Sequence, residues 1–168
     1  MAKVAERAGV STALVHYHFA TKAHLTIAAA GWVVDARSSA LRDSLGRGRG
    51  LDALDALWSD VTARAQNGAE RAWLELSAAA RGDPGLAAVI ERGRRADREA
   101  WTARIPALLK ELGVEPATGA EELAGVLAVT LDGLAVALVS GEPAAGVRAA
   151  YDALWLILVA AGQGGRRR

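Results

Sequence analysis

The stretch VAERAGVSTALVHYHFATKAHL, residues 4–25, decides how the start of this chain folds. Its alanines and charged side chains favour a helix over residues 2–8, and Gly9 can adopt the turn conformation that residues with a Cβ resist. Ser11 then stands where an N-cap belongs, so we predict a second short helix over residues 12–18. Two short helices joined by a glycine-centred turn form the helix-turn-helix pattern.

The second short helix would present a polar face that suits the major groove of DNA. Hydroxyl groups and aromatic rings can bond phosphates or base edges, and an alanine methyl group can contact thymine. Thr21 can cap a long third helix to about Leu45, in whose first turn Lys22 can reach a backbone phosphate. Residues 1–30 contain three basic side chains, Lys3, Arg7 and Lys22, and one acidic side chain, Glu6, so this segment is positively charged.

These residues resemble the DNA-binding signature of the TetR family of transcriptional regulators. The matching positions are Val4, Ala5, Ala8, Gly9, Val10, Ser11, Val15, His18, Phe19, Thr21, Lys22 and Leu25. The resemblance implies an all-α fold, in which a helix-turn-helix head joins a larger helical domain for ligand binding and dimerisation. It implies groove-facing or phosphate-binding roles for Ser11, Thr12, Ala13, His16, Tyr17, His18 and Lys22. It implies a DNA-binding regulator, and we expect a ligand-responsive repressor on double-stranded DNA.

The chain departs from the family in two ways. His16 replaces a common tyrosine, so one phosphate contact is altered or moved to Tyr17. Family members also have a further helix before the position of Met1, which covers the apolar sides of Val4 and Val15. Two interpretations stay open: the true start lies upstream, or the chain is an N-terminally truncated helical ligand-binding dimer with little or no DNA binding.

The remainder of the chain is also expected to be helical, because apolar–polar alternation is missing and Ala, Leu, Arg and Glu dominate. The sequence GRGRG at 46–50 breaks the third helix, so we assign 1–45 to the head with its connecting helix and 46–168 to the larger domain. Thr118 and Glu121 have capping-box spacing. Pro106 is expected to end or kink a helix. The expected helices cover residues 51–66, 69–81, about 86 to 106, 119–140 and 143–161.

The last two expected helices carry apolar residues on more than one side. The first has one stripe of Leu123, Leu127, Leu131, Leu134 and Leu138, and another side of Val126, Val129, Gly133 and Val136. The second has Val147, Tyr151, Leu154 and Leu158 on one stripe and Trp155, Val159 and Gly162 on another. Pairing with a second copy in a four-helix bundle would bury both sides, whereas two internal core helices are the alternative. A homodimer through 119–140 and 143–161 would suit a palindromic operator.

Three tryptophans lie on successive middle helices, where family members enclose an effector. Trp58, Trp73 and Trp101 therefore are candidates to bind an apolar or aromatic small molecule, with plain core packing as the alternative. Asp132 inside the leucine stripe must be hydrogen-bonded or face water, and we favour a structural role. ERGRRADRE, residues 91–99, is interpreted as a solvated helix face, with anion binding as the alternative.

Several classes of function are disfavoured. The chain has no cysteine, which excludes thiolate chemistry and disulfides. His16 and His18 point about 200° apart on a helix, so a zinc site with His24 is not expected. No nucleophile–base pair or carboxylate pair recurs on a helix face, so we expect no enzyme, and we expect no cofactor. The apolar stretches are too short or interrupted for a membrane span, which favours a cytoplasmic protein.

Overall fold

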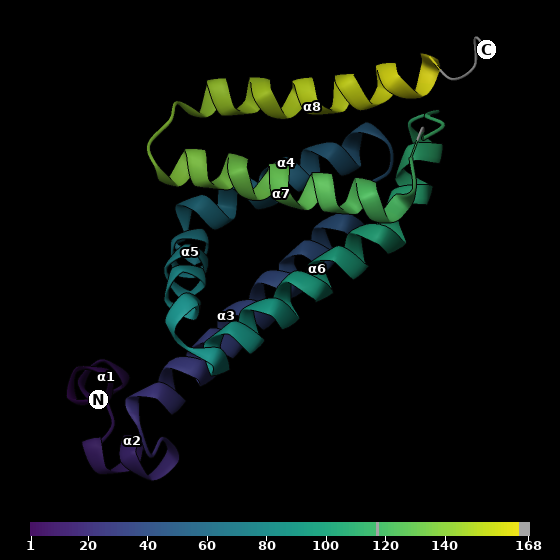
Figure 1. Ribbon diagram of the computed structural model, residues 1–168. Helices are drawn as coiled ribbons and strands as arrows, with labels where there is room; N and C mark the ends of the chain where they lie inside the picture. Colours follow the sequence, from purple (N-terminus) through teal and green to yellow (C-terminus); the bar gives the residue numbers. More distant parts are fainter. Residues whose placement is uncertain (117, 165–168) are drawn as a thin grey trace.

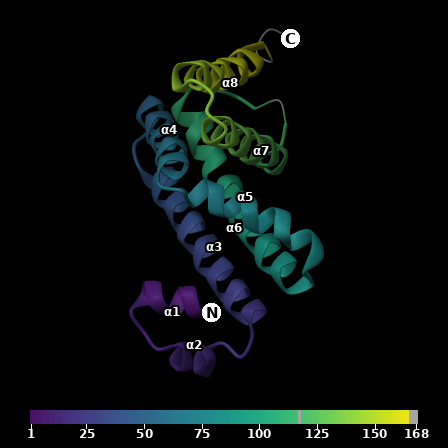
Figure 2. The ribbon, with the colours of Figure 1, turned by 90° about the vertical axis from the view of Figure 1, so that its left-hand side faces the viewer.

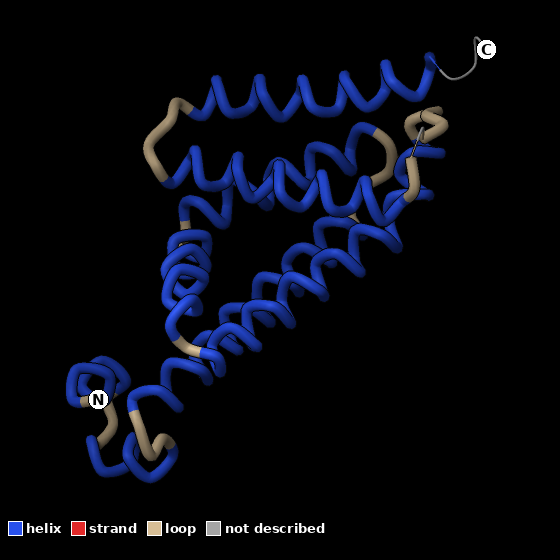
Figure 3. Tube along the Cα trace, in the orientation of Figure 1, coloured by secondary structure: helices blue, strands red, loops and turns tan. Residues whose placement is uncertain are grey.

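The structure is a computed structural model that describes the backbone of residues 1–116 and 118–164, and side chains up to residue 160. Within these residues the chain forms helices and connecting loops and no strand (Figure 3). The fold is therefore all-α, as the sequence predicts. The helices are α1 (Ala2–Ala8), α2 (Thr12–His18), α3 (Lys22–Gly46), α4 (Leu51–Gln66), α5 (Ala69–Ala79), a short 3₁₀ turn (Ala80–Gly82), α6 (Pro84–Glu111), α7 (Ala120–Val139) and α8 (Ala144–Gly164).

Two long helices span the molecule from one end to the other. α3 and α6 lie side by side and run in the same direction (Figure 1). α1 and α2 sit at the end where α3 begins, whereas α7 and α8 lie at the opposite end (Figure 2). The small head is thus separated from the apolar C-terminal helices by the first part of α3, since among the described residues α7 meets α3 only at Arg37 and beyond.

A glycine permits the close approach of the two long helices. A Cβ built on Gly93 of α6 would lie 2.7 Å from Cγ1 of Val34 on α3, and Val34 is buried. Real Cβ atoms do not come this close to a neighbour, so residue 93 must lack a side chain for α3 and α6 to pack as they do.

The interior has two apolar clusters with a polar layer between them. The smaller cluster lies toward the head and joins α3, α5 and α6 through Ala30, Val34, Trp73, Leu86, Val89 and Ile90. The larger one joins α3, α4, α6, α7 and α8, and includes Leu41, Leu57, Trp101, Leu127 and Tyr151. Arg37 of α3 and Asp97 of α6 are buried. Along each of these two helices the charged residue lies between the residues of the smaller cluster and those of the larger one. Charged groups therefore occupy the middle of the bundle.

Helix α6 continues through Pro106, so of the two expectations for this proline, an end or a kink, the end is wrong. The missing amide hydrogen and the ring of a mid-helix proline cost about 3 kcal/mol. Ile105, Leu108 and Leu109 around it are all buried in the larger cluster. Burying each such side chain contributes roughly 1.5–3 kcal/mol, which together exceeds the cost.

Two further local expectations are corrected. No side chain caps α7, because its N-cap is Gly119 and the Thr118 hydroxyl donates to the Gly119 carbonyl instead. On α8, Trp155 is buried beside Tyr151 with ring centroids 6.1 Å apart, so the two expected stripes face the same core. Gly162 lies outside the residues whose side chains are described. The outer face of α8 instead exposes Leu156 and Ile157.

Candidate functional site

The first two helices form a compact turn. Gly9 ends α1 with φ of 65°, the left-handed conformation that its lack of a Cβ allows. The amide of Val10 donates to the carbonyl of Ala5 over 3.0 Å, which closes the turn. The hydroxyl of Ser11 then accepts the amide of Leu14 over 3.1 Å and caps α2. The predicted helix-turn-helix geometry is present.

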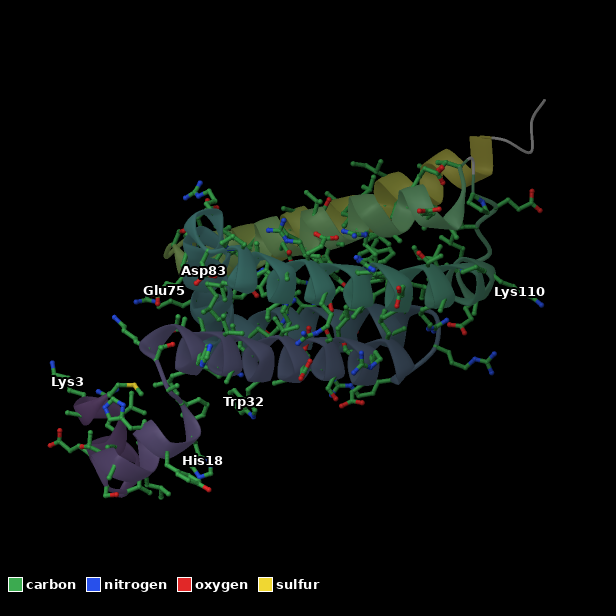
Figure 4. The ribbon with its side chains drawn as sticks, turned by 60° about the horizontal axis from the view of Figure 1, so that its bottom comes forward. Lys3, His18, Trp32, Glu75, Asp83 and Lys110 are labelled. Atoms are coloured by element: carbon green, nitrogen blue, oxygen red, sulfur yellow. The ribbon has the colours of Figure 1, made fainter. Side chains whose placement is uncertain are left out.

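The seven residues predicted to contact DNA lie on or directly beside α2, and all are exposed: Ser11, Thr12, Ala13, His16, Tyr17, His18 and Lys22. Tyr17 is 84% exposed, whereas Val15 on the opposite side of α2 is buried. The Tyr17 and His18 rings meet edge to face with centroids 5.2 Å apart. In Figure 4 His18 and Lys3 lie on the outside of the head. The polar side of α2 is therefore free to meet a partner.

The Ser11 hydroxyl already has a structural task, because it accepts the capping hydrogen bond of α2. It keeps its own hydrogen to donate to a phosphate oxygen. Thr21 caps α3 in the same way, accepting the amide of His24 over 3.1 Å, and so sets Lys22 at the first position of α3. Both cap predictions from the sequence are confirmed.

Residues 1–29 match the family model for bacterial regulatory proteins of the tetR family. The start of the chain is therefore similar to the DNA-binding head of TetR-family regulators. The match ends within the first turns of α3, so it says nothing of the other helices of the chain. No curated protein and no solved structure gives a match to the chain.

The larger helical part of the chain holds a cavity of about 420 Å³ between α3, α4, α6 and α7. Its lining consists of Arg37, Leu41, Arg64, Arg94, Asp97, Arg98, Trp101, Gly125, Ala128, Val129, Leu131 and Asp132. The volume suits a small organic molecule. The lining combines apolar side chains with charged groups.

Arg37 links three helices to α3 at the wall of this cavity. Its Nη1 donates to Oε2 of Glu70 over 2.8 Å, and its Nε donates to Oδ2 of Asp97 over 3.3 Å. Its Nη2 donates to Oδ1 of Asp132. The guanidinium carbon lies 4.6 Å from the centre of the Trp73 ring. Burial opposes its charge, but the carboxylates of Asp132, Glu70 and Asp97 outweigh burial and raise the pKa of Arg37.

Glu70 on α5 is shared between two arginines. Arg64 of α4 donates to the same Oε2 over 2.8 Å and also bonds Asp60 over 2.9 Å. Oε1 of Glu70 is buried and has no hydrogen-bond partner among the described residues. Burial raises the pKa of Glu70 above its usual value, although Arg37 and Arg64 oppose the shift.

Only one of the three predicted effector-binding tryptophans lines the cavity. Trp101 belongs to the lining and is itself buried. Trp58 instead packs on Tyr151 of α8 with ring centroids 5.4 Å apart, and Trp73 lies under Arg37. The three tryptophans lie on successive helices but at different places in the bundle. The order of the helices along the chain does not reveal these places. Here the structure gives these two rings packing partners.

Arg37, Arg64 and Asp97 are not among the functional candidates predicted from the sequence. A usable signal exists for two of them: Arg37 lies three residues after Val34 and four before Leu41, and Asp97 lies midway between Gly93 and Trp101. Charges at core positions of a helical repeat indicate buried ion pairs. Residues 91–99 are thus not simply a solvated face. Within this segment Glu91 bonds Arg98 over 3.1 Å.

An apolar outer surface remains on the C-terminal helices. Val126 and Val129 of α7 are 52% and 74% exposed, and Leu156 and Ile157 of α8 are 69% and 67% exposed. Among the described residues, α7 alone is long and apolar enough to cross a membrane, judged by length and composition. Its Asp132, however, is ion-paired with Arg37, and its leucines face the larger cluster. We interpret α7 as a packed helix with one uncovered side.

No group of three or more potential metal ligands occurs among the residues that the structure describes. His16 and His18 extend from one short helix, while His24 follows on α3.

Proposed function

We propose that this TetR-family regulator is a ligand-responsive cytoplasmic repressor that binds a palindromic operator as a homodimer. The outward, fully exposed polar side of α2 carries the proposal, because it can enter a major groove without rearrangement. Thr12, Ala13, His16 and Tyr17 would contact base edges or phosphates. Ser11, His18 and Lys22 would contact the backbone beside them.

The uncovered apolar surface of α7 and α8 supports dimerisation. Four large aliphatic residues on two adjacent helices are each more than half exposed. Packing α7 and α8 against their copies would remove this surface from water and set two heads on one duplex. Half-sites would then lie about 34 Å apart or at a multiple of that distance.

The connection between cavity and head supports a ligand response. Arg37, at the cavity wall, belongs to α3, the same helix whose first residue is Lys22 of the proposed DNA surface. A ligand that changes the partners of Arg37 would therefore tilt or stabilise the helix that carries the head. Such a ligand releases DNA only if it binds the DNA-free arrangement more tightly, and coupling free energies are typically about 1–3 kcal/mol.

The DNA-binding proposal is tested by a Thr12→Ala, Tyr17→Ala double variant. A fluorescent duplex is first selected by the wild-type protein from a randomised pool, and binding is then followed by anisotropy. The double variant should lose binding but keep the molar mass of the wild type in light scattering. Leu51→Ala removes a side chain that is 72% exposed at the start of α4 and serves as the control. Retained DNA binding by the double variant would contradict the assigned face.

A second function is favoured by the thin interior of the head. Ala5 and Val15 are its only buried residues, while Val4 and Leu14 are each 44% exposed. A head with so little core can hold α2 poorly, which would suit a helical ligand-binding dimer with little DNA binding. The wild-type protein would then select no duplex from the pool and still bind a ligand in its cavity.

A further inference from the structure

One exposed guanidinium group in the cavity lining has no carboxylate partner among the residues that the structure describes. Of the four arginines in its lining, Arg37 and Arg64 bond buried carboxylates and Arg98 bonds Glu91. Arg94 makes no hydrogen bond or ion pair with any residue that the structure describes. Its guanidinium carbon lies 5.9 Å from the centre of the Trp73 ring, a contact that holds the group near the cavity without neutralising it.

The carboxylates of the lining are already occupied. Asp132 accepts Arg37, and Asp97 accepts both Arg37 and the hydroxyl of Ser38. A cationic ligand would have to displace Arg37 from one of them and leave a buried guanidinium with fewer partners, which is costly. An anionic ligand meets Arg94 without breaking any of these bonds. The available charge that faces the cavity is therefore positive.

The apolar part of the cavity continues from Arg94 along one face of α6. Arg94 and Trp101 are seven residues apart, two turns of helix or about 10 Å along the axis. Trp101 together with Leu41 and Leu131 supplies apolar surface to the lining. A ligand with an anionic group at one end and an apolar body would match both parts.

We propose that the cavity binds an amphipathic monoanion whose carboxylate pairs with Arg94 and whose apolar body lies against Trp101. This inference rests on the proposed function only in taking the cavity to be the effector site. It names the chemical class of the effector: a hydrophobic carboxylic acid, aliphatic or aromatic.

The proposal is tested by titrating the full chain with matched compounds in a calorimeter. Octanoate, octanol and octylamine share one body and differ in charge, and naphthoate, naphthalenemethanol and naphthylmethylamine form an aromatic series. In each series the carboxylate should bind about tenfold more tightly than the alcohol, the size of one charge-assisted hydrogen bond. The amine should bind more weakly than the carboxylate. Amines or alcohols that bind as tightly as the carboxylates, or carboxylates that do not bind, would overturn the proposal.

The neighbouring arginine on α6, Arg95, provides a matched control for Arg94. Arg94→Met should weaken carboxylate binding about tenfold and leave alcohol binding unchanged. Arg95 is also exposed on α6 but lies outside the cavity lining, so Arg95→Met should bind every compound as the wild type does. Equal carboxylate affinity in the wild type and Arg94→Met would overturn the role of Arg94.

The ligand class and the proposed function fail in different ways. Carboxylate binding that depends on Arg94 but leaves the affinity for the selected duplex unchanged would uphold the anion site and contradict the ligand response. Duplex release by an alcohol or amine but not by a carboxylate would uphold the response and contradict the anion site. Calorimetry and anisotropy report on the two separately.

Discussion

Arg37 and Arg64, from α3 and α4, donate to the same oxygen of Glu70, each over 2.8 Å. Glu70 is fully buried on α5, so one carboxylate joins three helices in the middle of the molecule. Arg37 extends the cluster to α6 through Asp97 and to α7 through Asp132. Five helices thus meet at a set of charges rather than at an apolar contact, and this set forms part of the cavity wall.

Replacing Arg37 by methionine should destabilise the protein strongly. Methionine keeps an unbranched apolar chain but leaves Glu70 and Asp97 without their shared cation, and breaking a buried ion pair costs about 3–5 kcal/mol. Urea unfolding followed by circular dichroism measures the loss. Arg42→Met on the same helix replaces an exposed arginine and should change the free energy of unfolding by less than about 0.5 kcal/mol. Similar values for the two variants would mean that the cluster contributes little to stability.

The raised pKa of Glu70 predicts a pH-dependent stability. Because the pKa of Glu70 in the folded protein lies above its value in the unfolded chain, folding favours the protonated carboxyl group. The stability that the protonated Glu70 contributes is fully present below the unfolded pKa of about 4.5, and it is lost as the pH rises through the folded pKa. Glu70→Gln imitates the protonated form at every pH. The free energy of unfolding of Glu70→Gln should therefore rise relative to the wild type between acidic and neutral pH. A difference that stays constant with pH would show that Glu70 is not protonated preferentially in the fold.

Ile157→Glu should break the proposed dimer. Placing a carboxylate on an apolar surface removed from water is costly unless the charge is paired. Sedimentation velocity should show the wild type as a dimer and the variant as a folded monomer at the same concentration. Leu51→Glu places the same charge on another exposed leucine and should stay dimeric. A wild type that sediments as a monomer would contradict the dimer.

The head should exchange its amide hydrogens much faster than the long helices. α1 and α2 pack mainly on each other and bury only Ala5 and Val15, so opening them exposes little apolar surface. Hydrogen exchange read by mass spectrometry should show low protection in residues 2–18 and high protection around Val34 and Trp101. Adding the selected duplex should protect α2 in particular. If the amides of α1 and α2 in the DNA-free protein were as well protected as those of α3, the small number of buried residues in the head would not explain its stability, and the prediction would be wrong.

Local sequence was sufficient for the head and for most helix ends. Gly9, Ser11 and Thr21 act through their own backbone and the next few amides, so their roles follow from neighbours in the chain. The order of helices and the polar side of α2 could be predicted for the same reason. Pro106 could not, because the burial of Ile105 and Leu108 that offsets its cost comes from helices distant in sequence.

The candidate cavity depended on tertiary structure. Helix order and the family resemblance made Trp58, Trp73 and Trp101 candidates to bind an effector, but which ring lines a cavity depends on how four helices cross, and of the three only Trp101 does so. Arg37 looked like one charge among many until packing brought Glu70, Asp97 and Asp132 to it from three other helices. Short-range hydrogen bonds are encoded locally, whereas the partners of a buried charge are chosen by residues far away along the chain. The sequence by itself thus determined a helix-turn-helix head with an exposed polar helix face, and the tertiary structure decided where the bundle leaves a cavity and which of its lining arginines lacks a carboxylate partner among the described residues.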